Sequence, residues 1–338
     1  MKFGPLAVEE AAGAIAAHSV RAGEAVVKKG SVIAREDVQR LKAAGIDRVV
    51  AARLEPGDIG EDEAAGRLAE ALAGQNVSAE RPFTGRSNLF ARTAGVLLVD
   101  RAAVDSVNTV DEAITAATLP AYKPVVVGEM IGTVKIIPYA VREDLLEEAL
   151  GRARQGLSIA PYARRRVGVI STLLPGLKTR VIDKTVAVLR GRLEPAGAAV
   201  CTEARVPHET EPLSRALAEQ AAGEPELIVV YGASAIADRR DVVPAAIEAA
   251  GGRVEHFGMP VDPGNLLLVG ALDGTPVIGA PGCARSPKEN GFDWVLQRLL
   301  AGLSVTRADI TALGVGGLLM EIVSRPQPRG GGESRDEP

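Results

Sequence analysis

The sequence predicts an α/β protein in which an open, mostly parallel sheet is preceded by a smaller α+β N-terminal region. Two observations point to this class. From Val167 onward, short apolar segments alternate regularly with helical patterns, as expected for parallel strands joined by helices. One of these segments, Leu227–Val230, is rich in β-branched residues and indicates a buried strand. Before Val167 the pattern is less regular, so we expect a separate region there.

Residues 1–155 are assigned to the α+β region, as one body or two subdomains. Helical patterns cover residues 7–18, 36–44, 62–73, 104–117 and 141–155. Strand patterns cover residues 25–27, 47–52 and 95–99, and the stretch 123–139 is strongly β. Ser87 and Asn88 could cap a helix or touch a ligand, and capping is the commoner use. Residues 155–166 mark the boundary, and their arginine run is more typical of a solvated link than of a phosphate site.

Residues 166–302 are assigned to the parallel-sheet domain. Its strands are predicted at residues 167–171, 199–202, 227–230 and 253–259, followed by a hairpin formed by residues 266–270 and 276–280. The Asp273-Gly274 pair is a strong signal for that hairpin turn. Helices are predicted at residues 179–193, 211–222, 241–250 and 292–300. Residues 324–338 have the composition of a disordered tail.

Composition excludes several classes of function. The net charge is −4 and aromatic residues make up 3% of the chain, so nucleic acid is not an expected partner. Two cysteines cannot form a disulfide framework, which favours a cytoplasmic location. The apolar runs are too short to span a membrane, and the first residues do not have the pattern of a signal peptide.

Four predicted loops, rich in Gly, Pro, Ser or Asp, follow strands of the predicted sheet. They comprise residues 171–176, 232–241, 259–265 and 279–286. Ligands of open parallel sheets bind beyond the carboxyl ends of the strands. One such loop would be an ordinary turn, but four at one edge are hard to explain as turns alone. We therefore expect a ligand site there, with its anion at a helix start.

These loops resemble the molybdopterin-binding domain shared by gephyrin-type and bacterial molybdopterin molybdenumtransferases and by molybdopterin adenylyltransferases. The similarity covers about residues 166–302. It is carried by five short motifs: Ser171-Thr172; Asp183 on the next helix; Tyr231-Gly232-Ala233-Ser234 followed by Asp238 and Asp241; Pro263-Gly264; and Ala280-Pro281-Gly282-Cys283-Ala284. More faintly, residues 1–150 resemble the extra domains of the molybdenumtransferases.

The chain departs from the family pattern at three motifs. The Gly-Asp-Glu expected after Ser171-Thr172 is replaced by leucines, the Lys of Pro-Gly-Lys is Asn265, and one Gly of the central motif is Tyr231. We expect no C-terminal β domain of the molybdenumtransferase kind. The segment from Pro281 to Leu303 resembles a subfamily in which this domain is joined to a molybdenum cofactor nucleotidyltransferase.

The resemblance implies that the ligand is molybdopterin, free or adenylylated, with molybdate as a substrate and Mg²⁺ as a cofactor. It implies Asp183, Asp238 and Asp241 as catalytic residues, with Mg²⁺ held by Asp183 and Asp241; the choice between Asp238 and Asp241 as the motif aspartate stays open. The cofactor-binding residues it implies are Ser171, Thr172, Gly232, Ala233, Ser234, Pro263, Gly264, Pro281, Gly282, Cys283, Arg285 and Ser286. Backbone amides near Gly282 would hold the phosphate.

Three functions are compatible with this resemblance. The first is insertion of molybdate into adenylylated molybdopterin with loss of AMP. The second is a binding module that holds molybdopterin or finished cofactor for a separate nucleotidyltransferase or a molybdoenzyme. The third, adenylylation of molybdopterin, would leave residues 1–155 without a purpose. The lost Gly-Asp-Glu favours the second function, whereas Asp183 and the N-terminal region favour the first. We also expect a homo-oligomer.

Overall fold

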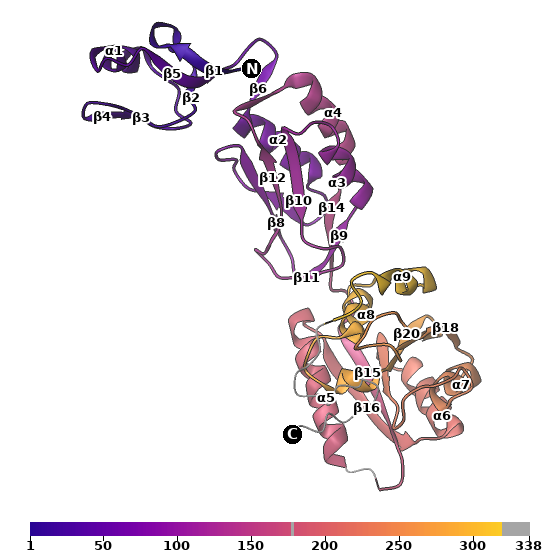
Figure 1. The fold of residues 1–338 in the computed structure, drawn as a ribbon. Helices are drawn as coiled ribbons and strands as arrows, with labels where there is room; N and C mark the ends of the chain where they lie inside the picture. The colour runs from indigo at the N-terminus through magenta and orange to yellow at the C-terminus, as the bar shows by residue number, and fades with distance from the viewer. Residues whose placement is uncertain (177–178, 320–338) are drawn as a thin grey trace, which may run out of the picture. The chain divides into compact units, whose positions relative to one another are not determined.

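The computed structural model describes residues 1–176 and 179–319 (Figure 1). The chain divides into two compact units, Met1–Pro161 and a second unit that begins at Tyr162. The second unit contains a six-stranded, largely parallel sheet, and the first contains several small antiparallel sheets. The predicted fold class is therefore confirmed. None of the helices in the described part of the chain is long and apolar enough to cross a membrane.

The first unit begins with a three-stranded antiparallel sheet of order β1-β5-β2. Its strands are β1 (Lys2–Ala7), β2 (Ile15–Ala16) and β5 (Arg48–Arg53). The short ribbon β3 (Val20–Ala22) and β4 (Ala25–Val27) and the helix α1 (Arg35–Ala43) complete this part. Buried Val8, Ile33, Leu41 and Val49 form its core.

The rest of the first unit has a larger core, which includes Leu68, Leu97, Ile131 and Leu146. A four-stranded sheet runs β10-β12-β8-β7, a three-stranded sheet runs β11-β9-β14, and β13 pairs with β6. These strands are β6 (Asp58–Gly60), β7 (Val77–Ala79), β8 (Arg86–Ala91), β9 (Gly95–Val99), β10 (Ile114–Thr118), β11 (Pro124–Val125), β12 (Met130–Ile136), β13 (Ala140–Arg142) and β14 (Leu157–Pro161). The helices are α2 (Glu61–Leu72), α3 (Arg101–Asn108) and α4 (Glu143–Ala153).

Three predictions for the first unit were wrong. Residues 104–117 are not one helix, because the Asn108 side chain pairs with both backbone groups of Ala116, at 2.9 and 2.7 Å, and the chain continues as β10. Residues 7–18 form only a single 3-10 turn, Val8–Glu10, followed by β2. Ser87 and Asn88 lie within β8 rather than at a helix start. In each case pairing with a distant strand outweighs local preference.

The second unit is organised by a sheet of order β16-β15-β17-β20-β19-β18. Its strands are β15 (Arg166–Leu173), β16 (Ala199–Pro207), β17 (Leu227–Tyr231), β18 (Arg253–Phe257), β19 (Leu268–Leu272) and β20 (Thr275–Ala280). The first four strands in the order are parallel, and β19 is antiparallel to both of its neighbours. The β19–β20 hairpin turns at Asp273 and Gly274, whose φ values of 49° and 81° fit the turn expected for Asp-Gly.

Helices cover both faces of this sheet (Figure 1). They are α5 (Thr179–Leu193), α6 (Thr210–Ala221), α7 (Val242–Ala249) and α8 (Gly291–Leu300), followed by the short α9 (Arg307–Thr311). On one face, Leu213 and Leu217 of α6 and Ile247 of α7 pack against Ile228 and Val230. Side chains alternate along a strand, so Ser171 and Tyr231 point to the other face, toward α5 and α8.

The predicted boundary falls partly within regular structure. Residues 157–161 form β14, which pairs with β9. Beyond it, the Tyr162 hydroxyl bonds Gln297 Oε1 at 2.5 Å, and the Ala163 and Arg164 amides both donate to Leu300 O. The assigned limits 1–155 and 166–302 stay predictions, and the predicted tail 324–338 lies outside the described residues.

Candidate functional site

The carboxyl ends of β15, β17, β18 and β20 bring the four predicted loops to one edge of the sheet. Two hydrogen bonds join three of the loops, and a third ties the loop after β18 to the first residue of α8. Arg285 Nη2 donates to Gly232 O at 2.6 Å, the Ala233 amide donates to Thr172 Oγ1 at 2.7 Å, and the Gly291 amide donates to Pro263 O at 2.8 Å. The four loops therefore form one connected surface.

The loop after β20, residues 281–290, is the part of this surface best suited to an anion. It opens with a 3-10 turn, Gly282–Arg285, in which the Ala284 amide donates to Pro281 O and the Ser286 amide to Cys283 O. Gly282 does not need the left-handed backbone region, and a Cβ added there would meet no atom within 4 Å. Gly282 thus presents open backbone, and its role is not to allow an unusual backbone angle.

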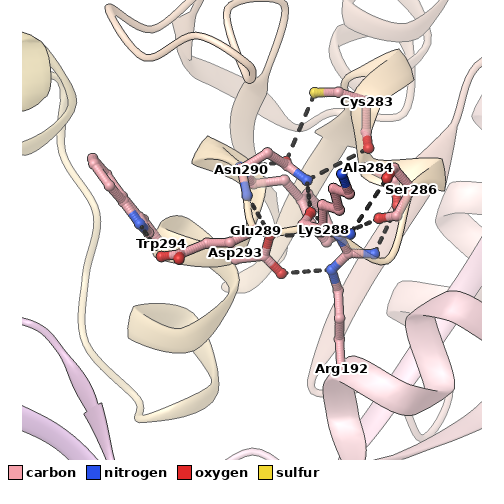
Figure 2. Close-up of polar contacts among 10 residues, drawn as sticks. Arg192, Cys283, Ala284, Ser286, Lys288, Glu289, Asn290, Asp293 and Trp294 are labelled. Carbon is pink, nitrogen blue, oxygen red and sulfur yellow. Dashed lines mark hydrogen bonds and ion pairs between the residues drawn. The ribbon is translucent and has the colours of Figure 1, made fainter. Parts of the chain in front are cut away.

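Arg192 of α5 anchors this loop from beneath (Figure 2). Its side chain is only 8% exposed. The guanidinium donates to Ala284 O at 2.8 Å, to Ser286 O at 2.7 Å and to Asp293 Oδ1 at 2.5 Å. It also lies 5.6 Å from the centre of the Phe292 ring, a cation–π distance. The loop is therefore tied to two helices, α5 and α8.

Asn290 ends the loop and begins α8 (Figure 2). Its side-chain oxygen accepts a hydrogen bond from the backbone amide of Phe292 at 3.1 Å, and the backbone amide of Asn290 donates to Asp293 Oδ2 at 2.8 Å. Together these bonds make a capping box. The Asn290 side-chain nitrogen also donates to Lys288 O at 3.0 Å. Asn290 is 2% exposed, so one buried side chain fixes both the helix start and the loop.

The loops after β15 and β17 meet at a polar chain of three residues. The Thr172 hydroxyl accepts from the Ala233 amide and lies 2.8 Å from His208 Nδ1. A hydroxyl has one hydrogen and two lone pairs, so in this second contact the donor is Thr172 or His208 according to the tautomer of the ring. Thr172 is 1% exposed, so it holds the Gly232–Ser234 turn from within.

Two buried hydroxyls at this end of the sheet have no hydrogen-bond partner among the described residues. They are Ser171 Oγ and Tyr231 Oη. The two residues stand opposite each other in the β15–β17 pairing and are each 2% exposed. Burial raises the pKa of the Tyr231 hydroxyl, although Arg192 and Arg285 oppose that shift. The Tyr231 hydroxyl therefore stays protonated and can donate a hydrogen bond.

Each aspartate implied as catalytic has a partner of its own. Asp183 Oδ1 accepts from Arg205 Nη2 at 2.7 Å, and Asp238 Oδ1 accepts from Arg240 Nε at 2.7 Å, an ion pair that lowers the pKa of Asp238. Asp241 caps α7: Oδ1 accepts from the Val242 amide and Oδ2 from the Ala237 amide. Within the described residues, no group of three or more His, Cys, Asp or Glu side chains could hold a metal ion.

The remaining implied residues have structural contacts. An added Cβ at Gly264 would lie 2.9 Å from the backbone of Gly291, so Gly264 allows the loop to pack against the start of α8. Cys283 Sγ lies 3.7 Å from Asn290 Oδ1. Sequence reasoning missed Arg192, Asn290 and His208, since their partners lie as many as 101 residues away in the chain or outside the recognised motifs.

One comparison with known protein families covers the part of the chain that contains these loops. Residues 168–302 match a family described as "Probable molybdopterin binding domain", and residues 5–53 match a "Domain of unknown function (DUF8806)". No curated protein matched the chain.

Two solved structures share weak similarity with the chain. The molybdopterin biosynthesis moea protein from Pyrococcus horikosii is 14% identical, with 89% of this chain and 75% of that chain covered and a TM-score of 0.31. The CinA protein with unknown function from Thermoplasma acidophilum is 18% identical, with 36% of this chain and 90% of that chain covered and a TM-score of 0.27. These scores are too low to carry an argument. The family match identifies residues 168–302 as a domain of the probable molybdopterin-binding family.

Proposed function

We propose that this protein binds molybdopterin at the loop formed by residues 281–290 and serves molybdenum cofactor biosynthesis. The observation that supports this most is the open backbone at Gly282, at the carboxyl edge of the sheet and within the matched domain. Molybdopterin carries a phosphate, and backbone amides at such an edge are a common phosphate site. Arg285 and Lys288, in the same loop, would add charge-assisted hydrogen bonds.

We expect Gly282→Val to weaken molybdopterin binding while leaving the fold intact. A valine side chain meets only open space in the protein, so it would occupy the volume that the phosphate needs. The dissociation constant, measured by anaerobic calorimetric titration, should rise by about tenfold or more, equivalent to the loss of at least one charge-assisted hydrogen bond.

The matched control is Gly191→Val. Gly191 lies on α5, and a Cβ added there also meets nothing within 4 Å. This variant should bind molybdopterin like the wild type. If the Gly282 variant and the wild type bind molybdopterin with equal affinity, the phosphate does not bind at this loop.

Insertion of molybdate into adenylylated molybdopterin is the second candidate function, and the exposed carboxylate of Asp183 favours it. Asp183 lies on α5, which follows the loop after β15, and its side chain is 58% exposed. As arranged, however, Asp183 and Asp241 do not fit a shared Mg²⁺, because both oxygens of Asp241 accept backbone amides. We therefore derive no step through the metal, and the geometry supports a binding module better than an enzyme.

Release of AMP from adenylylated molybdopterin, with molybdate and Mg²⁺ present, separates the two functions. If the protein is a binding module, the wild type releases no AMP. If the wild type does release AMP, Asp183→Asn should abolish it, since the substitution keeps the size of the side chain and removes its charge.

Arg205→Gln is the control, because it breaks the same ion pair with Asp183 and keeps the carboxylate. Activity that survives Asp183→Asn would show that this carboxylate has no part in the reaction. The proposed partners, a nucleotidyltransferase or a molybdoenzyme, and self-association stay predictions.

A further inference from the structure

We propose that Arg192 is the positioning residue that shapes residues 281–290 into an oxyanion site, an inference that rests on the proposed function. Arg192 lies about 90 residues before this loop and belongs to none of the family motifs in the sequence. It touches the loop from the protein interior, so it acts on the ligand through the backbone. The ligand group concerned is a phosphate monoester.

The hydrogen bonds and the ring contact of Arg192 are with the loop and with the helix that follows it. Its guanidinium donates to the carbonyl oxygens of Ala284, Ser286 and Lys288, at 2.8, 2.7 and 3.3 Å. These are alternate residues of one short segment. The carboxylate of Asp293 balances its charge and also accepts from the Asn290 amide. One buried side chain thus determines the direction of three alternate carbonyl groups.

Carbonyl direction decides whether a loop can accept an anion. A carbonyl oxygen is the negative end of its peptide unit, and in a trans peptide the N–H points the opposite way. Carbonyls that faced outward would repel a phosphate. Arg192 binds the carbonyls of Ala284 and Lys288 from the interior, so the N–H groups of the same peptide units, those of Arg285 and Glu289, point to the outer side of the loop. The Ser286 carbonyl also points inward, but the next residue is Pro287, which has no N–H. The outer side therefore offers these two N–H groups together with the cationic side chains of Arg285 and Lys288.

Arginine is required for this arrangement, because a planar guanidinium offers five donors in a fixed fork whereas a lysine ammonium is a compact point charge. Lysine could keep the ion pair with Asp293 but could not reach three carbonyls at once. The Phe292 ring, 5.6 Å from the guanidinium carbon, further fits a flat delocalised cation. The conservative substitution Arg192→Lys therefore keeps the positive charge and removes the planar set of donors, so it tests the geometry of the guanidinium separately from its charge.

The experiment compares full-length wild type, Arg192→Lys and Arg192→Met by titration with molybdopterin and with the same pterin after enzymatic removal of its phosphate. We expect Arg192→Lys to weaken binding of the phosphorylated ligand about tenfold and Arg192→Met to weaken it further. Binding of the dephosphorylated ligand should change little. Arg190→Met is the matched control, since Arg190 lies on the same helix with its side chain 59% exposed, and it should behave like the wild type.

Hydrogen–deuterium exchange on the same variants distinguishes loop positioning from general stability. We expect faster exchange in residues 281–290 of Arg192→Lys and unchanged exchange in β15 and β17. If Arg192→Met does not fold, the comparison of Arg192→Lys with the wild type tests the proposal by itself. Unchanged affinity in a folded Arg192 variant, or equal losses for both ligands, would overturn the proposal. If the wild type binds no molybdopterin, the proposed function fails; titration with inorganic pyrophosphate then tests the loop, and equal binding by wild type and Arg192→Lys overturns the positioning role.

Discussion

At the residue scale, Tyr231 is the largest departure from the family motifs, since a bulky side chain stands where a glycine is expected. It ends β17, is 2% exposed and has a hydroxyl without a partner among the described residues. A buried polar group that forms no hydrogen bond costs about 1–3 kcal/mol of stability. The hydroxyl of Tyr231 is therefore expected to destabilise the unliganded protein.

We predict that Tyr231→Phe raises the free energy of unfolding by about 1 kcal/mol, because it removes the unpaired hydroxyl and keeps the ring. Chemical denaturation measures this. The control is Tyr162→Phe, which removes a hydroxyl bonded to Gln297 Oε1 at 2.5 Å and should lower stability. A Tyr231 variant that is less stable than the wild type would show that the hydroxyl is satisfied in solution.

The sequence could name the residues of the loops, because Gly, Pro and Ser signal turns and turns at strand ends bind ligands. It could not show that Asp241 uses both carboxylate oxygens on backbone amides, or that Asp183 pairs with Arg205. The Asp183–Arg205 pair depends on how α5 packs against β16, whereas the amide partners of Asp241 are near it in the sequence and depend on the local turn before α7. Helix caps and ligand sites use the same short polar side chains, so the sequence pattern alone cannot distinguish the two roles.

At the element scale, α8 is the helix that connects the site to the core. Its predicted extent, residues 292–300, is close to the observed Gly291–Leu300. Phe292 and Leu296 of this helix are fully buried. The sequence pattern did not identify Asn290 as the cap, since the signal comes from a capping box with Asp293 that also supports the preceding loop.

We predict that Asn290→Ala lowers the free energy of unfolding by about 1–2 kcal/mol, the usual cost of losing an N-cap. The variant also loses the bond to Lys288 O, so exchange in residues 281–290 should become faster. The control is Thr306→Ala, which removes a similar capping box from the short helix α9. A change in exchange at residues 281–290 in the Thr306 variant, or none in the Asn290 variant, would contradict this role.

At the scale of the whole molecule, the two units differ in how well their sequences predict them. In the second unit, strand and helix alternate along the chain and in space, so β15 to β20 follow from local pattern. In the first unit, the short helix α3 and the strand β10 are separated only by residues 109–113. This close succession within one stretch of apolar pattern explains why the segment 104–117 is predicted as a single helix.

The central claim, that molybdopterin binds at the carboxyl edge of the second unit, is tested most directly by hydrogen–deuterium exchange of the full chain. Exchange is compared with and without molybdopterin under anaerobic conditions. Bound ligand should slow exchange in residues 281–290 and 232–234, which are joined by the Arg285–Gly232 hydrogen bond, and should leave residues 1–161 unchanged. Slower exchange confined to residues 1–161, or no change anywhere at saturating ligand, would contradict the account.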